Sequence, residues 1–271
     1  MNHCARVAGH CGRCEGDLPF EFTMAFQPIV DLAAARITTY EALVRGPGGE
    51  SAWSVLSKVT EDLLYRFDQA CRVRAIEMAS ELGMDEALSI NFLPNAVYEP
   101  SACIQATLEV SRRVGWPTER IVFEITETER VKDRDHLRGI IDAYRSMGFT
   151  TALDDFGNGY ANLDLLTDLQ PDTLKIDREL VMGCDGDRRR QALLHGVSRI
   201  ADELGIQLIA EGVETREEAL WLGRAGITRQ QGFFYARPKV ASLAGDLGET
   251  LAELRDCLSH ETPARHGYSA R

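Results

Sequence analysis

Residues 149–176 read FTTALDDFGNGYANLDLLTDLQPDTLKI, and this stretch decides the fold class. A short apolar run over 149–153 predicts a strand, the period of 162–169 predicts a helix, and 172–176 predicts a second strand. The alternation extends in both directions: we expect helices over 133–147, 191–204, 216–225 and 243–258, and strands over 206–210 and 228–234. Such a succession is typical of an α/β protein with a parallel sheet.

The first part of the chain follows a different order. Strands expected over 22–30 and 37–44 are separated only by a short polar turn, so they are close enough to form a hairpin. A helix over 54–82, a strand ending at Phe92, a helix over 101–114 and a strand from Ile121 complete the series. Eight strands fit a closed TIM-type (β/α)8 barrel better than an open doubly wound sheet, although periodicity alone does not exclude the open sheet.

Composition narrows the class of protein. The chain has 271 residues, of which 44% are hydrophobic and 27% charged, as in a soluble globular protein. No apolar stretch approaches the roughly 20 residues that span a bilayer, and the first residues lack the apolar core of a secretory signal. We therefore expect a cytoplasmic protein without a membrane segment. The formal net charge of -12 argues against general binding to nucleic acid.

Polar residues end nearly every predicted strand. In a barrel, the carboxyl ends of the strands meet at one face, so these side chains should share a site. The residues are Glu41, Asn91, Glu124, the pair Asp154-Asp155, Lys175, Glu211 and Gln231. Carboxylate and amide oxygens without His or Cys are ligands suited to Mg²⁺ or Mn²⁺ rather than zinc. A single strand-end acid is usually a helix cap or a solvated loop residue, but this many together predict two metal ions, with one aspartate of the pair bridging them.

At this point the sequence closely resembles the EAL-domain family of cyclic-di-GMP phosphodiesterases. The resemblance covers about residues 22–245 and rests on several motifs in order. These are Phe26-Gln27-Pro28, Glu41-Ala42-Leu43-Val44-Arg45, Asn91, Phe123-Glu124-Ile125-Thr126-Glu127, Asp154-Asp155-Phe156-Gly157, Lys175-Ile176-Asp177, Glu211-Gly212-Val213-Glu214 and Gln231-Gly232-Phe233. The resemblance implies a modified (β/α)8 barrel whose first strand is antiparallel, spanning residues 20–258.

The resemblance also implies an activity, the hydrolysis of cyclic-di-GMP to 5'-pGpG with two Mg²⁺ or Mn²⁺ ions, and a homodimer. The implied metal ligands are Glu41, Asn91, Glu124, Asp154, Asp155 and Glu211. Catalysis would involve Asp155, Lys175 holding the attacking water, Glu211 as the candidate general base and Gln231 orienting the water network. Substrate contacts would come from Gln27, Leu43, Arg45 and Asp177, and Glu127 would anchor the loop after Asp155.

One alternative stays open: a catalytically silent cyclic-di-GMP receptor, or a protein-binding regulator, on the same barrel. Degenerate members of the family usually lack some of the ligands, and this chain lacks none of them. No cyclase or sensor domain is recognisable, so we expect regulation through the N-terminal extension, the dimer, or a separate sensor or regulatory protein.

The extension at 1–19 contains a single Cys-x-x-Cys pair, Cys11 and Cys14, with Cys4, His3 and His10 nearby. A structural zinc site usually needs two such pairs, so both a mobile leader with incidental thiols and a metal or redox switch remain open. Cys71, Cys103, Cys184 and Cys257 lie in helical or apolar settings and are expected to be free core thiols. The tail at 259–271 is expected to be mobile.

Overall fold

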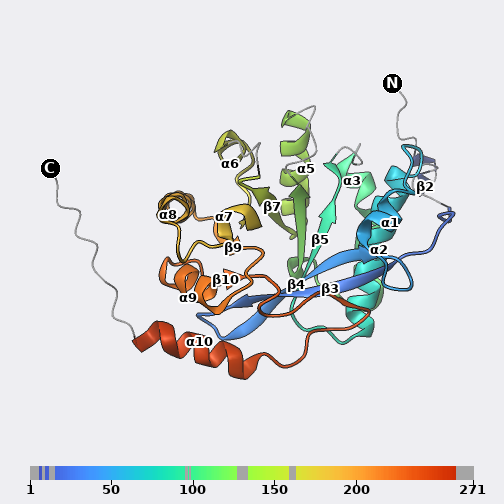
Figure 1. The fold of residues 1–271 in the computed structure, drawn as a ribbon. Coiled ribbons are helices and arrows are strands. Elements are labelled where there is room, and N and C mark those ends of the chain that lie inside the picture. Colours follow the sequence, from blue (N-terminus) through green and yellow to red (C-terminus); the bar gives the residue numbers. More distant parts are fainter. Residues whose placement is uncertain are drawn as a thin grey trace.

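Eight strands of the described chain close into a barrel, and the first of them runs antiparallel to both neighbours (Figure 1). A computed structural model describes residues 6–7, 10–11, 16–94, 97, 99–126, 134–158 and 163–260. Neighbouring strands from β4 through β10 are parallel. The barrel strands are β3 (Thr23–Asp31), β4 (Arg36–Arg45), β5 (Ala87–Phe92), β6 (Ile121–Thr126), β7 (Thr150–Phe156), β8 (Thr173–Ile176), β9 (Gln207–Ala210) and β10 (Arg229–Gln230). The predicted modified TIM barrel is therefore confirmed.

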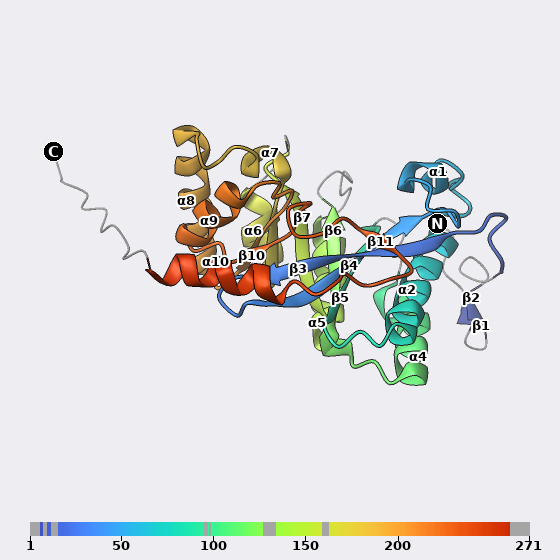
Figure 2. The same cartoon turned by 60° about the horizontal axis from the view of Figure 1, so that its bottom comes forward.

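Helices follow the parallel strands and cover the outside of the barrel (Figures 1 and 2). They are α1 (Ala52–Leu56), α2 (Leu64–Glu81), α3 (Pro100–Cys103), α4 (Gln105–Val114), α5 (Arg134–Ser146), α6 (Leu163–Leu169), α7 (Arg178–Val181), α8 (Arg188–Leu204), α9 (Arg216–Arg224) and α10 (Gly248–His260), with a 3₁₀ turn at Thr118–Arg120. None of these described helices is long and apolar enough to cross a membrane.

Several predicted boundaries were wrong. The helix expected over 54–82 is divided into α1 and α2. The backbone between them forms turns with hydrogen bonds to the third residue back, such as Lys58 N to Val55 O and Leu63 N to Thr60 O, in place of the helical pattern. The helix expected over 101–114 is divided at Ile104, and α10 begins at Gly248 rather than 243. The short helix α7 and the short strand β11 (Lys239–Val240), which pairs with β3, were not predicted.

The last barrel strand is also shorter than predicted. We expected a strand over 228–234, but β10 ends at Gln230. A Cβ atom added to Gly232 would lie only 2.0 Å from Val213 O, so the chain turns closely against the loop after β9. This turn leaves Gln231, directly after β10, bonded through its backbone N–H to Ala210 O at the end of β9.

The two ends of the barrel differ in what covers them. Leu251 and Leu254 of α10 belong to the same apolar cluster as Val30 and Leu32 at the end of β3. Helix α10 therefore closes the end at which β4 begins, toward the bottom of Figure 1. The carboxyl ends of β4 to β9 lie at the opposite end, which is where sites of this architecture form.

The cysteines fall into two groups. Cys71, Cys103, Cys184 and Cys257 are free, as predicted. In the N-terminal segment, Arg6–Val7 (β1) and His10–Cys11 (β2) form a separate antiparallel pair. The mobile tail was predicted to begin at residue 259, but residues 259 and 260 belong to α10, so that boundary was wrong. The side chains of the proposed cysteine switch and the residues after His260 fall outside the described part of the chain, so those expectations stay predictions.

A buried glutamate fixes the loop that follows β9. Both carboxylate oxygens of Glu218, on α9, accept backbone N–H groups: Oε1 from Gly183 (2.7 Å), and Oε2 from Glu214 (2.8 Å) and Thr215 (3.1 Å). The Thr215 hydroxyl in turn accepts the N–H of Glu218, which completes a capping box. Although burial opposes it, these backbone donors lower the pKa of Glu218 below its ordinary value.

We expect Glu218→Gln to lower the free energy of unfolding by about 1–3 kcal/mol near neutral pH, because an amide cannot satisfy the same three donors. A carboxylate whose pKa is lowered by folding stabilises the protein above its unfolded pKa, and this contribution is lost as pH falls through the folded value. The difference between the two proteins, measured by urea unfolding, should therefore shrink in acid. The control is Glu217→Gln, an exposed position on the same helical turn, which should change the free energy of unfolding little at any pH.

Candidate functional site

Four carboxylates converge on one wholly buried lysine at the carboxyl ends of the strands. Lys175 Nζ, on β8, lies 2.8 Å from Glu124 Oε2 on β6 and 2.8 Å from Glu211 Oε1 beyond β9. It also lies 3.2 Å from Asp154 Oδ1 on β7 and 3.5 Å from Glu41 Oε2 on β4. The predicted strand-end residues thus meet, as the barrel requires.

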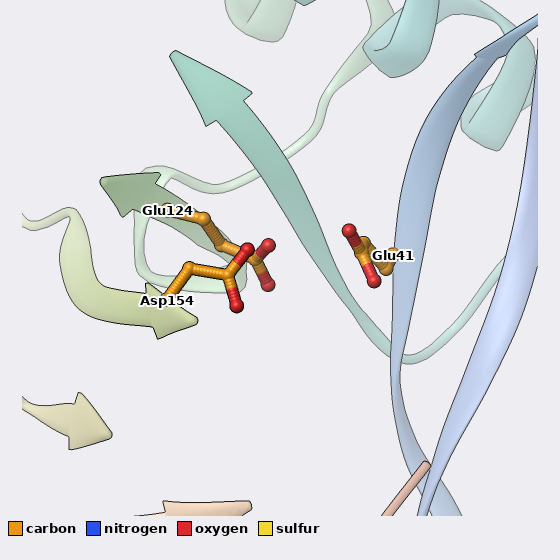
Figure 3. Close-up of side chains that lie close together, drawn as sticks. All are labelled: Glu41, Glu124 and Asp154. Carbon is orange, nitrogen blue, oxygen red and sulfur yellow. The ribbon is translucent and has the colours of Figure 1, made fainter. Parts of the chain in front are cut away.

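The acidic side chains form two overlapping groups. Figure 3 shows Glu124 and Asp154 side by side on adjacent strands, with Glu41 facing them from across the site. Oxygens of Glu41, Glu124 and Asp154 lie within 4.8 Å of one another, and so do oxygens of Asp154, Asp155 and Glu211. Asp154 belongs to both groups, which is the arrangement expected of a ligand shared by two ions.

A bulge in β7 explains how two consecutive aspartates serve one site. Successive side chains of a regular strand point to opposite faces. Here Leu153 pairs with Leu174 and Phe156 with Ile176, so Asp154 and Asp155 together oppose Lys175 alone. Asp155 has a φ of 58°, a left-handed conformation that aspartate tolerates better than most residues. The predicted strand end at 153 was therefore wrong, because the strand continues through the pair by means of this bulge.

Amide side chains surround Glu41. Asn91 Nδ2 donates to Glu41 Oε1 at 3.0 Å, and Gln231 Nε2 donates to Glu41 Oε2 at 2.7 Å and to Gln27 Oε1 at 3.3 Å. Asn91 uses its side-chain nitrogen in this hydrogen bond, so its side-chain oxygen remains available to bind a cation. Gln231 Oε1 is buried without a hydrogen-bond partner in the described chain. Buried acceptors are normally hydrogen-bonded, so this oxygen is available to a donor from water or from a ligand.

Burial and mutual repulsion act on the acidic groups. Burial, followed by repulsion from Glu41, raises the pKa of Glu124 to about 8. Burial, followed by repulsion from Asp154, raises the pKa of Asp155 to about 6. Burial also raises the pKa of Glu211 well above its ordinary value. Burial alone would lower the pKa of Lys175, but the surrounding carboxylates raise it well above its ordinary value.

This donor set fits a pair of divalent cations. Five carboxylates and one ammonium, all ionised, leave four negative charges, which two divalent ions would balance. The ligand atoms are oxygens, the type that Mg²⁺ and Mn²⁺ prefer. The same charges without cations are costly to bury, as the raised pKa values show.

The predicted substrate residues have separate positions around the site. Leu43 and Arg45 line, with Asn91, a largely apolar cavity of about 300 Å³ between the ends of β4 and β5 and helices α1 and α2. Gln27 Nε2 donates to Ala236 O at 3.1 Å. Asp177 caps α7 by accepting the N–H of Glu179 at 2.8 Å, a structural role that the sequence did not predict. Glu127 lies outside the described residues.

Ser89 is a residue of the site that the sequence analysis missed. Its buried hydroxyl donates to Glu124 Oε1 at 2.5 Å, while the other oxygen of Glu124 meets Lys175. The signal for it was present, because Ser89 precedes Asn91 by two residues and so faces the same side of β5. Glu124 is thereby held from two sides.

Comparison with known proteins gives one family. A model of the EAL domain matches residues 19–238. The blue light- and temperature-regulated antirepressor BluF of Escherichia coli is 34% identical over 218 residues, which make up 80% of this chain and 54% of that protein. The probable cyclic di-GMP phosphodiesterase PdeN of Escherichia coli is 30% identical over 231 residues, or 80% of this chain and 43% of that protein. The chain thus spans about half the length of these curated relatives.

Solved structures agree with the fold. A standalone versatile EAL protein from Vibrio cholerae O395, in its c-di-GMP bound form, superposes with a TM-score of 0.82 at 49% identity, over 84% of this chain and 97% of that one. A manganese/cy-diGMP complex of Klebsiella pneumoniae BlrP1 gives a TM-score of 0.78 at 36% identity, over 84% of this chain and 58% of that one.

Proposed function

The chain belongs to the EAL domain family, and we propose that it hydrolyses one phosphodiester bond of cyclic-di-GMP to give 5'-pGpG, with the help of two Mg²⁺ or Mn²⁺ ions. The observation that carries this proposal is the pair of overlapping carboxylate groups that share Asp154 around buried Lys175. A relative named as a probable cyclic di-GMP phosphodiesterase and a neighbour solved with manganese and cyclic-di-GMP support it. In a bacterial cell, this activity would lower the level of the second messenger.

The residues that would hold the ions are those of the two carboxylate groups together with the oxygen of Asn91. They are Glu41, Asn91, Glu124, Asp154, Asp155 and Glu211. Two bound divalent ions would supply charge stabilisation for the attacking and leaving oxygens of an in-line phosphoryl displacement. Because bare carboxylates repel phosphate, the same charge neutralisation would admit the substrate.

The chain's own residues would direct the attacking water. Lys175 Nζ, 2.8 Å from Glu211 Oε1, provides N–H donors that would hold this water beside the carboxylate. Glu211 is our candidate general base, since its carboxylate lies beside the ammonium that would hold the water. The unpaired Oε1 of Gln231 would accept a hydrogen bond and orient the water, and Asp155 would complete the site beside Asp154.

We place the substrate across the strand ends. Arg45 would contact a phosphate, and Leu43 and the apolar cavity beside it would take up an uncharged part of the nucleotide. Gln27, next to Gln231, and Asp177 would contribute polar contacts from neighbouring elements. Glu127 would anchor the loop after Asp155.

The decisive experiment is incubation of the purified protein with cyclic-di-GMP and Mn²⁺, followed by chromatography of the products. We expect 5'-pGpG to accumulate, and chelation of the metal to stop it. Binding of cyclic-di-GMP without any product would instead favour the alternative, a silent receptor or protein-binding regulator. That alternative has one observation in its favour, the similarity to a protein named as an antirepressor.

We also propose that the protein forms a homodimer through α8. Leu193 (56% exposed), Ile200 (37%) and Leu204 (50%), with half-buried Val197 between them, form an apolar stripe at spacings of three and four residues. These spacings place the side chains on one face of the helix. If two copies of α8 paired antiparallel about a two-fold axis near Val197, the positive start of one helix at Arg189 would approach the negative end of the other, where Glu203 lies.

Introducing Leu193→Glu together with Leu204→Glu should convert the dimer to a monomer, because four buried carboxylates at the two-fold interface would lack partners. Light scattering after size-exclusion chromatography measures the mass directly. Ala192→Glu, an exposed position on another face of α8, is the control and should leave the dimer intact. A monomeric wild-type protein, or a double variant that still dimerises, would refute this interface.

A further inference from the structure

A buried ion pair lies on the outer side of the barrel wall, behind two of the proposed ligands. Asp68 and Arg72 are one turn apart on α2, with exposed fractions of 3% and 0%, and their side chains form an ion pair. The pair makes no direct contact with the carboxylates around Lys175. Breaking such a pair is costly, but replacing both members with apolar residues is often neutral, so stability alone does not explain it.

The two oxygens of Asp68 have different partners. Oδ2 meets Arg72, whereas Oδ1 accepts the backbone N–H of Leu93 at 3.0 Å. Leu93 directly follows β5, where the regular hydrogen bonds of the strand end. Asp68 therefore fixes the chain two residues beyond Asn91.

Arg72 is held in turn by the layer between the barrel and α5. Its Nη1 donates to the Tyr144 hydroxyl at 3.3 Å, and its guanidinium carbon lies 5.9 Å from the ring centre of Phe92 and 5.6 Å from that of Phe123. These rings pack against Tyr144 as well, with centroids 5.7 Å and 5.0 Å from it. The orientation of Asp68 is thus set by a packed aromatic cluster.

Phe92 and Phe123, the two rings beside the Arg72 guanidinium, are each next in sequence to a proposed metal ligand. Phe92 follows Asn91 and Phe123 precedes Glu124, and side chains alternate between the faces of a strand. Asn91 and Glu124 are opposite each other in the β5–β6 pairing. The outward rings touch the guanidinium, while the inward neighbours reach Glu41 and Lys175.

We propose that Asp68 is a positioning residue that, through its hydrogen bond from the N–H of Leu93, fixes the end of β5 and thereby directs Asn91 toward Glu41 and the metal site. This inference rests on the proposed function. Asp68 and Leu93 also line the cavity beside Leu43 and Arg45, so a shift of this strand end would alter both the ligand geometry and the cavity.

Two double variants test the inference without leaving an unpaired buried charge. Asp68→Asn with Arg72→Met keeps an oxygen that can accept the N–H of Leu93, whereas Asp68→Leu with Arg72→Met removes it. We expect the leucine variant to bind Mn²⁺ about 10–100-fold more weakly in calorimetry, as when the support of a metal ligand is lost. The asparagine variant should stay within about threefold of the wild type. Equal affinities in both variants, whether weakened or not, would overturn the inference.

Amide hydrogen exchange of the wild-type protein provides a second test that needs no variant. The N–H of Leu93 should exchange as slowly as the buried amides of β5, and fast exchange would overturn the inference even if the leucine variant failed to fold. Failure of the proposed function is distinguishable from these outcomes. It would show as absence of 5'-pGpG or of Mn²⁺ binding in the wild type itself.

Discussion

Replacing Lys175 with methionine is expected to abolish hydrolysis of cyclic-di-GMP and to lower the free energy of unfolding of the metal-free protein by about 3–5 kcal/mol. The ammonium is wholly buried and is the shared partner of Glu41, Glu124, Asp154 and Glu211. Methionine fills a similar volume but leaves these carboxylates without a cation. They must then take up protons or repel one another in a poorly solvated space.

The stability loss should depend on pH in a defined direction. A carboxyl group whose pKa is raised by folding stabilises the folded state only while it is protonated, and this is lost as pH rises through the folded pKa. Burial and repulsion from Glu41 already raise the pKa of Glu124 to about 8. The Lys175 ammonium lowers this pKa, so replacing Lys175 would raise the pKa of Glu124 further. The variant should therefore lose most stability, relative to the wild type, in alkaline solution.

Urea unfolding with EDTA, compared between about pH 6 and pH 9, measures this effect. Exposed Lys239→Met on β11 is the matched control and should change neither stability nor turnover appreciably. Wild-type turnover in Lys175→Met would remove Lys175 from the proposed mechanism. An unchanged free energy of unfolding would show that its ion pairs do not stabilise the fold.

The sequence predicted that the polar residues around Lys175 would meet, because each of them belongs to the end of an apolar run. Glu41 and Glu124 lie in the carboxyl-terminal halves of β4 and β6, Glu211 directly follows β9, and a barrel brings these parts of its strands together whatever the lengths of the intervening helices. The hairpin of the first two strands was also visible, since only a short turn separates them. These features depend on local pattern and on topology.

Other features depend on contacts that a local pattern does not contain. The bulge at Asp154-Asp155 follows from pairing with β8, and sequence periodicity ended the strand one residue before it. The bond from Asp68 to Leu93 joins residues 25 positions apart, and that from Arg72 to Tyr144 spans 72. Asp68 and Arg72 look like ordinary polar residues of an amphipathic helix until α2 is placed against β5.

The bulge leads to the second large prediction, which concerns the number of bound ions. Asp154 belongs to both carboxylate groups, whereas Asp155 belongs only to the group with Glu211. Asp154→Asn should therefore weaken binding at both positions and reduce turnover at least about 100-fold. Asp155→Asn should spare the group formed by Glu41, Glu124 and Asp154, and asparagine can keep the left-handed backbone at φ 58°.

Equilibrium dialysis against Mn²⁺, with the metal counted by mass spectrometry, separates the two variants. At an Mn²⁺ concentration that saturates the wild type with about two ions per chain, we expect about one ion in Asp155→Asn and almost none in Asp154→Asn. Each variant removes one carboxylate charge, so the pair controls for the loss of charge itself. Without metal, the free energy of unfolding of either variant should be close to that of the wild type, because loss of one carboxylate charge relieves repulsion among the others. Equal ion counts in the two variants would contradict the sharing of Asp154, and the two groups would then have to be treated as one site for a single cation.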